Sequence, residues 1–405
     1  MPQITIAARS SPLSKAQVKE IESLIPEVTF IKHFVETTGD LDRKTSLRGM
    51  EKTDFFTREL DQMLLEKKCD ICVHSAKDLP DPLPEGLSIF ALTKGVDSSD
   101  SLVFNKALAE RPLIATSSIR REECVREIYP SARFIDLRGT IDERLKLLES
   151  EEVDGVVVAE AALIRLNLTH YKRIKLPGET TPYQGQLAIL GRKGEGSLKS
   201  LFSKLDIRKK ALHIGLTPPD ETLEKNILHH PMINIVQRPN VDLHSSAPFL
   251  LFTSKVAVDL FFDQATPSPE TQILAIGKAT ARRVEKRGSR VSQVAEESTL
   301  EGVIALLKKI PAEDRHCFWP HSALSRDVLR DFFNAEGGTL RECILYDTRS
   351  SPPSKQLNLT EFEEVIFTSP SCVESFAHFF GTLPSSVKWR AMGPVTEKKC
   401  TAVLR

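Results

Sequence analysis

The sequence lacks an excess of charge of either sign. Its 405 residues include 55 lysines and arginines and 55 aspartates and glutamates, which gives a formal net charge of zero. A chain without net charge creates no overall field that would draw it to nucleic acid or to a membrane surface. We therefore expect neither as a partner. The remaining composition, 40% hydrophobic and 27% charged, is typical of a globular protein with material for two or more cores.

Long hydrophobic runs are also missing. No apolar stretch approaches the roughly 20 residues that a membrane-spanning helix needs. The first residues, MPQITIAARSS, lack the basic segment and the apolar core of a secretion signal. These absences predict a cytoplasmic protein.

Cysteines are few and form no obvious set of pairs. They number seven, and most lie in apolar runs, which favours free thiols in a reducing compartment. Cys69 and Cys72 have the two-residue spacing of a redox or zinc pair. In a strand, however, side chains at this spacing point to opposite faces or nearly so, and no second pair exists. We therefore expect no metal ion.

Apolar runs and amphipathic stretches alternate along the first half. The amphipathic stretch 55–67 has apolar residues at spacings of three and four, which predicts a helix. Ser11-Pro12 is a typical helix start. This alternation predicts βαβ units with a mostly parallel sheet. The other expected elements are strands 3–8, 29–36, 69–74, 113–116, 133–137 and 154–159, and helices 118–128 and 140–149.

The second half contains an internal repeat. Residues 250–262, LLFTSKVAVDLFF, and residues 365–380, VIFTSPSCVESFAHFF, each read as an apolar strand that ends in Phe-Thr-Ser and leads into a helix. In both copies Val follows the Thr by five residues and Phe follows it by eight. A Gly-x-x-Thr motif comes after each copy, at 277–280 and 393–396. Motif and spacing together predict two similar α/β lobes.

Residues 73–80, VHSAKDLP, place three polar side chains directly after an apolar strand. These are His74, Lys77 and Asp78, and a proline-rich turn follows them. Because α/β sheets bind ligands at the carboxyl ends of their strands, we expect this group at the mouth of a cleft. A carboxylate beside an ammonium can stabilise a cationic intermediate. Taken alone, the octapeptide is better explained as a surface turn with a solvated ion pair.

Arginines gather at the same kind of position, where expected strands end and helices begin. Each guanidinium can grip a carboxylate with two hydrogen bonds. The nearby hydroxyls can cap the helices, whose free N–H groups then attract anions. Singly, each arginine is better explained as a surface ion-pair residue. Together they predict a cleft for a ligand with several carboxylates, and the five are Arg9, Arg120, Arg121, Arg138 and Arg144.

The first half resembles porphobilinogen deaminase, also called hydroxymethylbilane synthase. The resemblance covers residues 3 to about 190 in the order of the family. It implies an enzyme that joins four porphobilinogens head to tail and releases ammonia, with dipyrromethane as its cofactor and primer. The acetate and propionate arms of the substrate suit the arginines. The matching segments are AARSSPLSKAQ (7–17), TTGD (37–40), FFTREL (55–60), CVHSAKDLPDPLPEGL (72–87), ATSSIRREECV (115–125), LRGTIDERL (137–145), DGVVVAEAALIRLNL (154–168) and YQGQLAI (183–189).

The resemblance also implies roles for single residues. Asp78 would stabilise cationic pyrrole intermediates and guide proton transfer. Phe56 would stack beside the pyrrole of the substrate. The residues that would hold the carboxylates of cofactor and substrate are Arg9, Ser11, Lys77, Ser117, Ser118, Arg120, Arg121, Arg138, Arg144 and Arg165.

Three features depart from the family pattern. The family's third domain offers a cysteine to the dipyrromethane, but no cysteine lies between Cys124 and Cys317, so we expect this domain to be missing. The lid segment 47–54 has one glycine where the family is glycine-rich, and Thr140 replaces the usual asparagine. Three alternatives follow. The first half binds the primer without a covalent bond, attaches it to another thiol such as Cys69, Cys72 or Cys124, or has lost the polymerisation reaction.

The repeat in the second half resembles uroporphyrinogen-III synthase, from about residue 211 to the end. Further matching segments are 275–284, 317–348 and 391–399. The resemblance implies ring closure of hydroxymethylbilane with inversion of ring D, which demands positioning more than strong acids and bases. Tyr346 would assist departure of the hydroxyl. The residues that would line the cleft are Thr253, Ser254, Thr280, Thr368, Ser369 and Thr396, although helix capping is the alternative explanation for such hydroxyls.

The sequence thus predicts an α/β protein with a two-lobed periplasmic-binding-protein-like half and then a two-lobed uroporphyrinogen-III-synthase-like half. We expect a bifunctional, monomeric enzyme of tetrapyrrole (haem) biosynthesis that makes hydroxymethylbilane from porphobilinogen and then uroporphyrinogen III. The alternative is that only the cyclase is active and the first half merely binds carboxylated pyrroles. The expected bounds are 1–190 for the first half (second lobe about 97–180), 191–210 for a linker, and 211–405 for the second half (inner lobe about 242–348).

Overall fold

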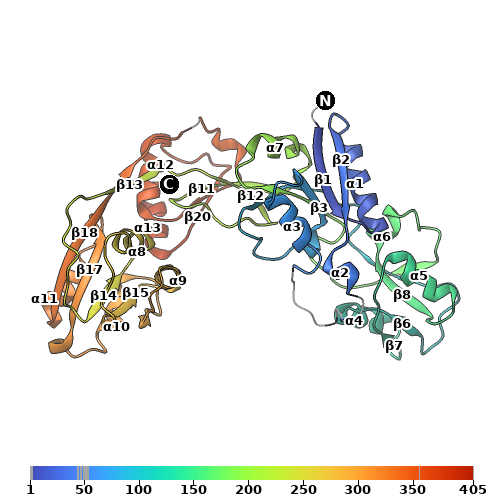
Figure 1. The fold of residues 1–405 in the computed structure, drawn as a ribbon, viewed down its shortest axis with the longest axis horizontal. Helices are drawn as coiled ribbons and strands as arrows, with labels where there is room; N and C mark the ends of the chain where they lie inside the picture. Colours follow the sequence, from blue (N-terminus) through green and yellow to red (C-terminus); the bar gives the residue numbers. More distant parts are fainter. Residues whose placement is uncertain (1–2, 43–44, 46–47, 49–53, 355, 405) are drawn as a thin grey trace. The chain divides into compact units, whose positions relative to one another are not determined.

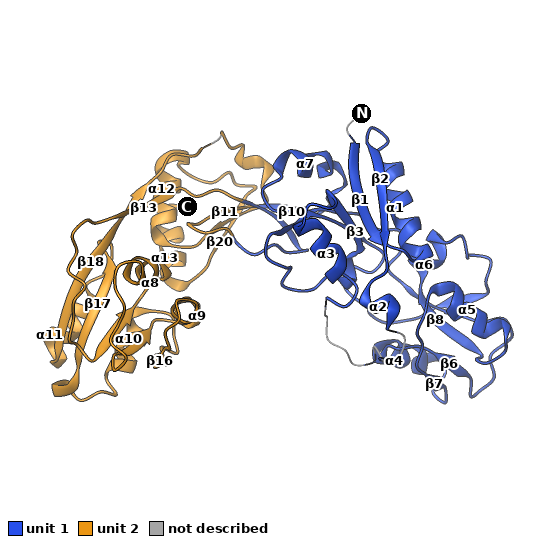
Figure 2. Cartoon of the chain, in the orientation of Figure 1, with its two compact units in different colours: residues 1–211, 219–228 blue, residues 212–218, 229–405 orange. Residues whose placement is uncertain are grey.

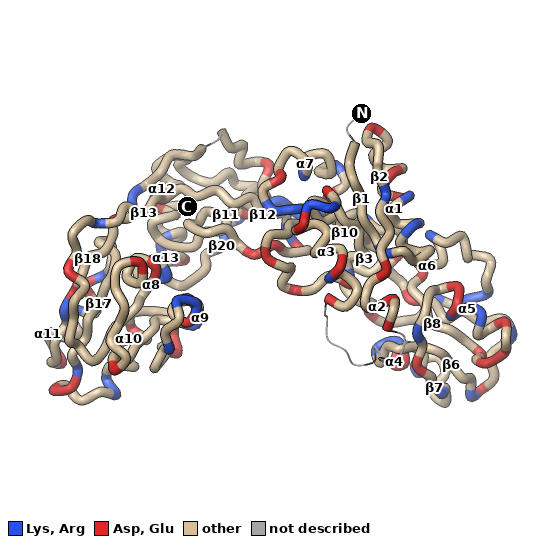
Figure 3. The backbone as a smooth tube through the Cα atoms, viewed as in Figure 1, with Lys and Arg blue, Asp and Glu red and all other residues tan. Residues whose placement is uncertain are grey.

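The computed structural model of the chain describes residues 3–42, 45, 48, 54–354 and 356–404. It divides into two compact units, which Figure 2 colours separately. The first comprises residues 1–211 and 219–228, and the second comprises residues 212–218 and 229–405. Lys and Arg are interspersed with Asp and Glu along both units (Figure 3). No helix within the described part of the chain is both long and apolar enough to span a bilayer.

The first lobe of the first unit is a five-stranded sheet with helices on both faces (Figure 1). The strand order is β2-β1-β3-β10-β4, and β10 alone runs against its neighbours. Apolar side chains of α1 fill one face and those of α3 fill the other. The elements are β1 (Gln3–Arg9), α1 (Pro12–Leu24), β2 (Thr29–Val35), α2 (Thr38–Leu41), α3 (Arg58–Leu65), β3 (Ile71–Ser75), β4 (Leu87–Leu92), β10 (Leu187–Arg192) and α7 (Gly196–Leu201).

The second lobe is a smaller sheet of order β7-β6-β8-β5-β9. Here β5 alone runs against its neighbours. The chain crosses between the lobes from β4 to β5 and returns from β9 to β10. The elements are β5 (Asp100–Val103), β6 (Leu113–Ala115), α4 (Ile119–Ile128), β7 (Arg133–Ile135), α5 (Ile141–Glu149), β8 (Gly155–Ala159), α6 (Glu160–Arg165) and β9 (Arg173–Lys175).

The predicted strands and helices of the first unit are confirmed within a few residues. The prediction that neighbouring strands run mostly parallel is only half right. Each sheet has two parallel and two antiparallel pairings, because β5 and β10 each follow a crossover and insert in the opposite direction. Ser11 caps α1 as expected, with its side chain accepting a hydrogen bond from the Ser14 N–H. Residues 191–210, the expected linker, contain α7, and Phe202 is fully buried in the core beside α1.

One expectation about the cysteines is wrong. The sulfur atoms of Cys69 and Cys72 do not point to opposite faces but lie 3.6 Å apart in the core. The physical reason is that Cys69 precedes β3, which begins at Ile71. It sits in the turn after α3, where Lys67 has a positive φ of 60°. The side-chain alternation of a strand therefore does not apply to it.

Two further α/β sheets follow. The larger lies in the second unit, and the smaller includes residues 209–211 and 225–228 of the first unit. The larger has the order β13-β18-β17-β14-β15-β16, and the smaller has the order β12-β11-β19-β20. The larger group comprises β13 (Ile233–Gln237), β14 (Phe249–Phe252), α8 (Lys255–Phe262), β15 (Gln272–Ala275), α9 (Lys278–Lys286), β16 (Gln293–Val294), α10 (Leu300–Leu307), β17 (His316–Ser322), α11 (Val328–Glu336) and β18 (Thr339–Ser350). The smaller group comprises β11 (Lys209–Ile214), β12 (Lys225–His229), β19 (Glu364–Phe367), α12 (Pro370–Phe380), β20 (Lys388–Ala391) and α13 (Pro394–Val403).

The internal repeat corresponds to one βαβα unit in each of these sheets. The strand pairs β14–β15 and β19–β20 are both parallel. The repeated Val and Phe positions form the buried faces of α8 and α12, at Val258, Phe261, Val373 and Phe376. The predicted α/β class with two lobes in each half is confirmed.

Candidate functional site

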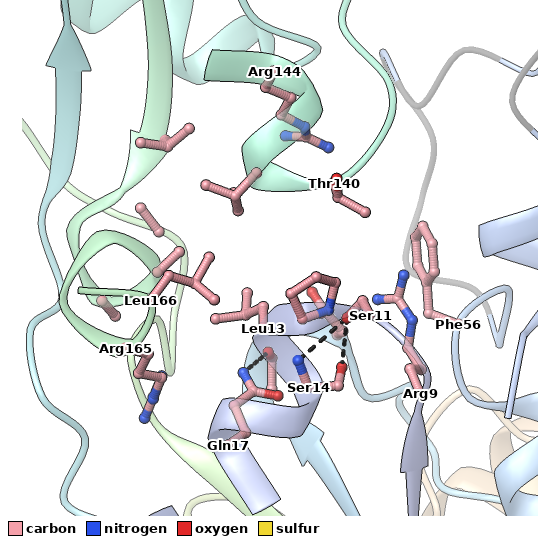
Figure 4. Close-up of a pocket in the computed structure, with 18 of the residues that line it drawn as sticks. Arg9, Ser11, Leu13, Ser14, Gln17, Phe56, Thr140, Arg144, Arg165 and Leu166 are labelled. Atoms are coloured by element: carbon pink, nitrogen blue, oxygen red, sulfur yellow. Dashed lines mark hydrogen bonds between the residues drawn. The ribbon is translucent and has the colours of Figure 1, made fainter. Parts of the chain in front are cut away.

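A cavity of about 440 Å³ lies between the two lobes of the first unit. Its walls are the carboxyl ends of β1 and β3 and the amino-terminal turns of α1 and α5 (Figure 4). The structure brings together nine of the residues predicted for this half: Arg9, Ser11, Phe56, Lys77, Asp78, Arg121, Arg138, Arg144 and Arg165. Three predicted residues do not line it, namely Ser117, Ser118 and Arg120.

Local structure explains how the two lobes supply these side chains. β1 ends at Arg9 and β3 ends at Ser75, and the 3-10 turn after β3 presents Lys77 and Asp78. From the other lobe, Thr140 caps α5, and Figure 4 shows Arg144 on this helix reaching toward the cavity. The carboxyl ends of strands and the starts of helices thus meet at one place, as expected for a ligand site in an α/β fold.

Lys77 is a basic residue and Asp78 an acidic residue of the cavity wall. The Lys77 ammonium donates a hydrogen bond of 3.3 Å to the side-chain oxygen of Gln184. Burial lowers the pKa of Lys77, while the charge of Asp78 opposes this shift. The third polar residue of this segment, His74, does not line the cavity. It is 5% exposed, and burial lowers its pKa to about 4, so it is neutral at physiological pH.

Arg138 and Arg144 face the cavity without a carboxylate hydrogen-bonded to either among the described residues. Arg138 donates to the carbonyl oxygens of Gly39 and Asp42, and Arg144 donates to the Gly139 carbonyl at 2.9 Å. Burial and the neighbouring guanidinium groups, Arg121 first among them, lower the pKa of Arg144 to about 10. Both guanidinium groups therefore keep N–H donors that an anionic ligand can use.

The other cations of the cavity are held by carboxylates. Arg9 forms an ion pair with Asp40 and lies over the ring of Phe56, with 4.5 Å from its guanidinium carbon to the ring centre. Figure 4 shows these two side chains next to each other. Because Asp40 also accepts hydrogen bonds from Thr37, its carboxylate fixes both Arg9 and the start of α2.

A buried aspartate that the sequence analysis did not single out anchors the arginines of α4. Asp100 is 1% exposed and accepts hydrogen bonds from Arg120 and Arg121. The amide of Gln184 donates to the same carboxylate at 2.9 Å. Arg120 is therefore a structural partner of Asp100 rather than a lining residue, whereas Arg121 both pairs with Asp100 and reaches the cavity wall.

Three further predicted residues mainly bind other parts of the first unit. The Arg165 guanidinium pairs with Glu20 of α1 and donates to the Gly185 carbonyl, and Figure 4 shows it turned away from the cavity. The hydroxyl of Ser117 donates to the Leu137 carbonyl oxygen and accepts from the Leu137 N–H. Ser118 caps α4.

The partners that fix these cations were missed by sequence reasoning, and only one carried a usable signal. Asp100 is a charged residue at the first position of the strand DSLV, which ends in two apolar residues, and a buried carboxylate calls for a buried cation. Asp40 and Gln184 lie in the matching segments TTGD (37–40) and YQGQLAI (183–189), which did not indicate what these side chains bind, and Glu20 lies among ordinary polar residues. The expected lid, 47–54, lies outside the described residues except for Arg48 and Asp54.

In the second unit the predicted hydroxyls form two equivalent groups, one in each lobe. Ser254 caps α8, and its hydroxyl lies 3.0 Å from the hydroxyl of Tyr346. Thr253 accepts a hydrogen bond from the indole of Trp319. In the other lobe Ser369 caps α12 and Thr368, which is exposed, donates to the Ile214 carbonyl. Thr280 and Thr396 occupy matching places on α9 and α13 and are both buried.

Comparison with known protein families divides the chain in the same way. Residues 4–200 match the family model described as porphobilinogen deaminase, dipyromethane cofactor binding domain. Residues 221–403 match the family model described as uroporphyrinogen-III synthase HemD. About 20 residues separate the two matches, which leaves no room for a further domain between them.

Two similar curated proteins are named as porphobilinogen deaminases, and one similar solved structure is a uroporphyrinogen III synthase. A probable porphobilinogen deaminase of Chlamydia pneumoniae is 37% identical over 211 residues, which cover 50% of this chain and 89% of the relative. A probable porphobilinogen deaminase of Sulfurisphaera tokodaii is 30% identical over 295 residues, covering 71% of this chain and 99% of the relative. A solved uroporphyrinogen III synthase of Thermus thermophilus is 16% identical, covers 48% of this chain and 88% of its own, and has a TM-score of 0.33.

Proposed function

The chain belongs to the porphobilinogen deaminase family and carries a uroporphyrinogen-III synthase domain behind it, and on this premise we propose that it performs both reactions. The first unit condenses four porphobilinogens into hydroxymethylbilane with release of ammonia. The second unit closes this linear product into uroporphyrinogen III.

The charge of the cavity is the observation that carries the first half of the proposal. Six cations and four carboxylates line it, and three of the cations, Lys77, Arg138 and Arg144, form no hydrogen bond with a carboxylate in the described part of the chain. Unpaired charges brought together in a half-buried site cost free energy until an anion binds. A pyrrole that bears acetate and propionate arms supplies such anions and leaves its ring for the apolar part of the wall.

We assign the electrostatic step to Asp78, which lines the cavity. When the aminomethyl C–N bond of porphobilinogen breaks, ammonia leaves and the pyrrole becomes a conjugated cation. The Asp78 carboxylate stabilises this cation electrostatically. The free α-carbon of the preceding pyrrole then attacks the methylene carbon and loses its proton, which we assign to the same carboxylate in the cavity wall. Phe56, held beside Arg9, offers a face for the ring.

The same residues fit a dipyrromethane. Bound there, this group supplies a primer with a free pyrrole α-carbon. Arg138 and Arg144 would hold its carboxylates from the second lobe, and Lys77 and Ser11 would hold them from the first lobe. Arg9 and Arg121 would orient the ligand while staying paired with Asp40 and Asp100.

For the second half we assign the hydroxyl groups of the two lobes to the substrate. Tyr346 would assist loss of the hydroxyl of the bilane, with Ser254 as its hydrogen-bond partner. Burial raises the pKa of Tyr346, so the phenol is a proton donor rather than a phenolate at neutral pH. Thr368 and Ser369, at the start of α12, would receive a carboxylate arm.

The test is the substitution Asp78→Asn in the full chain. We expect formation of hydroxymethylbilane from porphobilinogen to fall about 100-fold or more, because the electrostatic stabilisation of the cation is lost. Cyclisation of supplied hydroxymethylbilane should continue at the wild-type rate. Asp81→Asn, three residues away and exposed, is the matched control. Equal loss of both reactions in Asp78→Asn, or an unchanged rate of bilane formation, would refute the assignment.

A further inference from the structure

We propose that the acidic pyrrole primer of the first unit is held by ion pairs and hydrogen bonds alone, without a covalent bond to the protein. The inference rests on the proposed deaminase function, because a primer has a role only if the first unit extends a pyrrole chain. It concerns how the cavity between the lobes retains that primer.

The positions of the thiols exclude the usual thioether. All seven cysteines are buried, and none of the residues that line the cavity is a cysteine. In the first unit, Cys69 and Cys72 lie in the core beneath α3, where the Cys72 thiol donates to the Leu60 carbonyl oxygen. Cys124 lies in the core of the second lobe, next to Gly178. Each sulfur would have to leave a packed core to reach a pyrrole in the cavity.

Thiol acidity argues against attachment at Cys72, and burial argues against it at Cys69. The attacking species in thioether formation is the thiolate. Burial and the neighbouring Cys69 sulfur raise the pKa of Cys72 well above its usual value. The hydrogen bond with Cys72 lowers the pKa of Cys69, and the charge of Arg192 acts in the same direction. Cys69 is nevertheless 2% exposed and packed in the same core, so its sulfur does not reach the cavity. A reaction with a pyrrole would therefore need local unfolding of β3 and α3.

The cations that have no hydrogen bond to a carboxylate among the described residues provide the alternative to a thioether. A dipyrromethane carries four carboxylates, two on each ring. Lys77 comes from one lobe of the unit, and Arg138 and Arg144 come from the other, so a bound tetra-anion is held from both sides. Mutual repulsion of the guanidinium groups contributes to the low pKa of Arg144 and is relieved when carboxylates enter. Charge-assisted hydrogen bonds of this kind are the strong ones.

The start of α1 adds to the attraction, whereas the first turn of α5 carries the carboxylates of Asp142 and Glu143. Leu13 and Ser14 of α1 and Ile141 and Asp142 of α5 line the cavity. The first N–H groups of a helix attract anions through their partial positive charge. The volume of about 440 Å³ falls in the range of small-molecule sites, about 300–1,000 Å³. Binding energy is thus available without any covalent step.

A ligand held in this way differs from a covalent one in a measurable respect. Salt screens ion pairs, with a Debye length of about 3 Å at 1 M. Denaturation removes the cavity altogether. A primer bound without a covalent bond is therefore released by high salt and by denaturants, whereas a thioether survives both.

The experiment uses the full chain incubated with porphobilinogen and desalted in low-salt buffer. Bound dipyrromethane is measured with Ehrlich's reagent, and the mass of the protein is recorded under native and under denaturing conditions. We expect a native mass larger by two pyrrole units and a denaturing mass equal to that of the bare chain. Washing in about 1 M salt should move the Ehrlich-positive material into the filtrate.

Variants separate charge from covalent attachment. Arg144→Gln should weaken retention of the pyrrole at least about tenfold, because a charge-assisted contact is lost. Arg133→Gln, on an exposed strand position away from the cavity, is the control and should retain it. Cys69→Ala and Cys124→Ala, checked for folding by circular dichroism, should also retain it.

The possible outcomes are distinct. An adduct that survives denaturation and maps to a cysteine peptide would overturn the inference and leave the deaminase function intact. Bilane formation with no bound pyrrole by either mass measurement would do the same. Absence of both bound pyrrole and bilane would refute the proposed function and, with it, the inference. Reversible, salt-sensitive retention together with bilane formation would support both.

Discussion

Among single residues, Asp100 has the largest predicted effect on the cavity. Its carboxylate, 1% exposed, carries the ion pairs of Arg120 and Arg121 and a hydrogen bond from Gln184. Removing its charge leaves two guanidinium groups next to each other in a region with little water. The position of Arg121 in the cavity wall therefore depends on a residue that does not touch the ligand.

We expect Asp100→Asn to destabilise the first unit by about 3–5 kcal/mol, the usual cost of leaving a buried charge unpaired. Urea unfolding followed by fluorescence or circular dichroism would measure this. The exposed pair Lys106 and Glu151 provides the control, and Lys106→Gln should change stability by less than about 1 kcal/mol. A loss in Asp100→Asn no larger than in Lys106→Gln would show that the buried pair contributes little.

Asp61 on α3 should produce a pH dependence of stability. Burial raises the pKa of this carboxyl to about 6, from an ordinary value of 3.8. Between these two values the folded chain is protonated at Asp61 and the unfolded chain is ionised, so the folded state binds more protons. Stability from this group is therefore complete below about pH 4, falls as pH rises toward 6, and stays low above that.

Asp61→Asn removes the ionisation while keeping the shape of the side chain. At pH 7 we expect it to raise the free energy of unfolding by about 1–3 kcal/mol, since a shift of about two units corresponds to about 3 kcal/mol. The difference between variant and wild type should disappear at pH 4. Urea midpoints at pH 4, 5, 6 and 7 would test this, and a difference that is constant across the series would contradict it.

At the scale of elements, the repeated strand–helix junctions give a matched pair for testing the cyclase. Ser254 caps α8 beside Tyr346, and Ser369 caps the equivalent helix α12 in the other lobe. The two serines have the same local role, but only Ser254 touches the tyrosine. Their comparison therefore separates loss of a helix cap from loss of a contact with Tyr346.

Tyr346→Phe should slow cyclisation of supplied hydroxymethylbilane at least about tenfold and leave bilane formation unchanged. Ser254→Ala and Ser369→Ala should each cost about 1 kcal/mol of stability through the lost cap. Combined with Tyr346→Phe, Ser254→Ala should have a less than additive effect on the cyclisation rate, because the two hydroxyls act together. Ser369→Ala should act independently of Tyr346→Phe. Full additivity for both serines would argue against a role for the Ser254–Tyr346 pair.

Elements also show where pattern reasoning worked and where it failed. Strands and helices of the first unit agree with the expected ranges because apolar periodicity and helix caps are local signals. The antiparallel insertion of β5 and β10 is not local, since it arises when the chain crosses between lobes. The contact of Cys69 with Cys72 was missed because the strand begins later than its apolar run suggests.

At the scale of the whole molecule, the two activities should be separable by mutation in the intact chain. We expect Asp78→Asn to make no bilane but to cyclise it, and Tyr346→Phe to make bilane but to cyclise it slowly. A mixture of the two proteins should therefore convert porphobilinogen into uroporphyrinogen III, which neither makes efficiently alone. Separation of the uroporphyrinogen isomers by chromatography would measure this. If the mixture yields only the product of spontaneous ring closure, the two halves do not work independently.

The sequence by itself determined the α/β class, the two-lobed halves, the repeat in the second half and nine of the residues that line the cavity. It did so because periodicity, helix caps and strand-end motifs are encoded within short stretches of chain. Only the tertiary structure decided which cations remain available to a ligand. Arg165 is taken by Glu20, 145 residues away, and Arg9 is taken by Asp40, whereas Arg138 and Arg144 meet only carbonyl oxygens among their described hydrogen-bond partners. Whether a cation has a carboxylate partner depends on distances between residues that are far apart in the sequence, and a local sequence pattern does not record those distances.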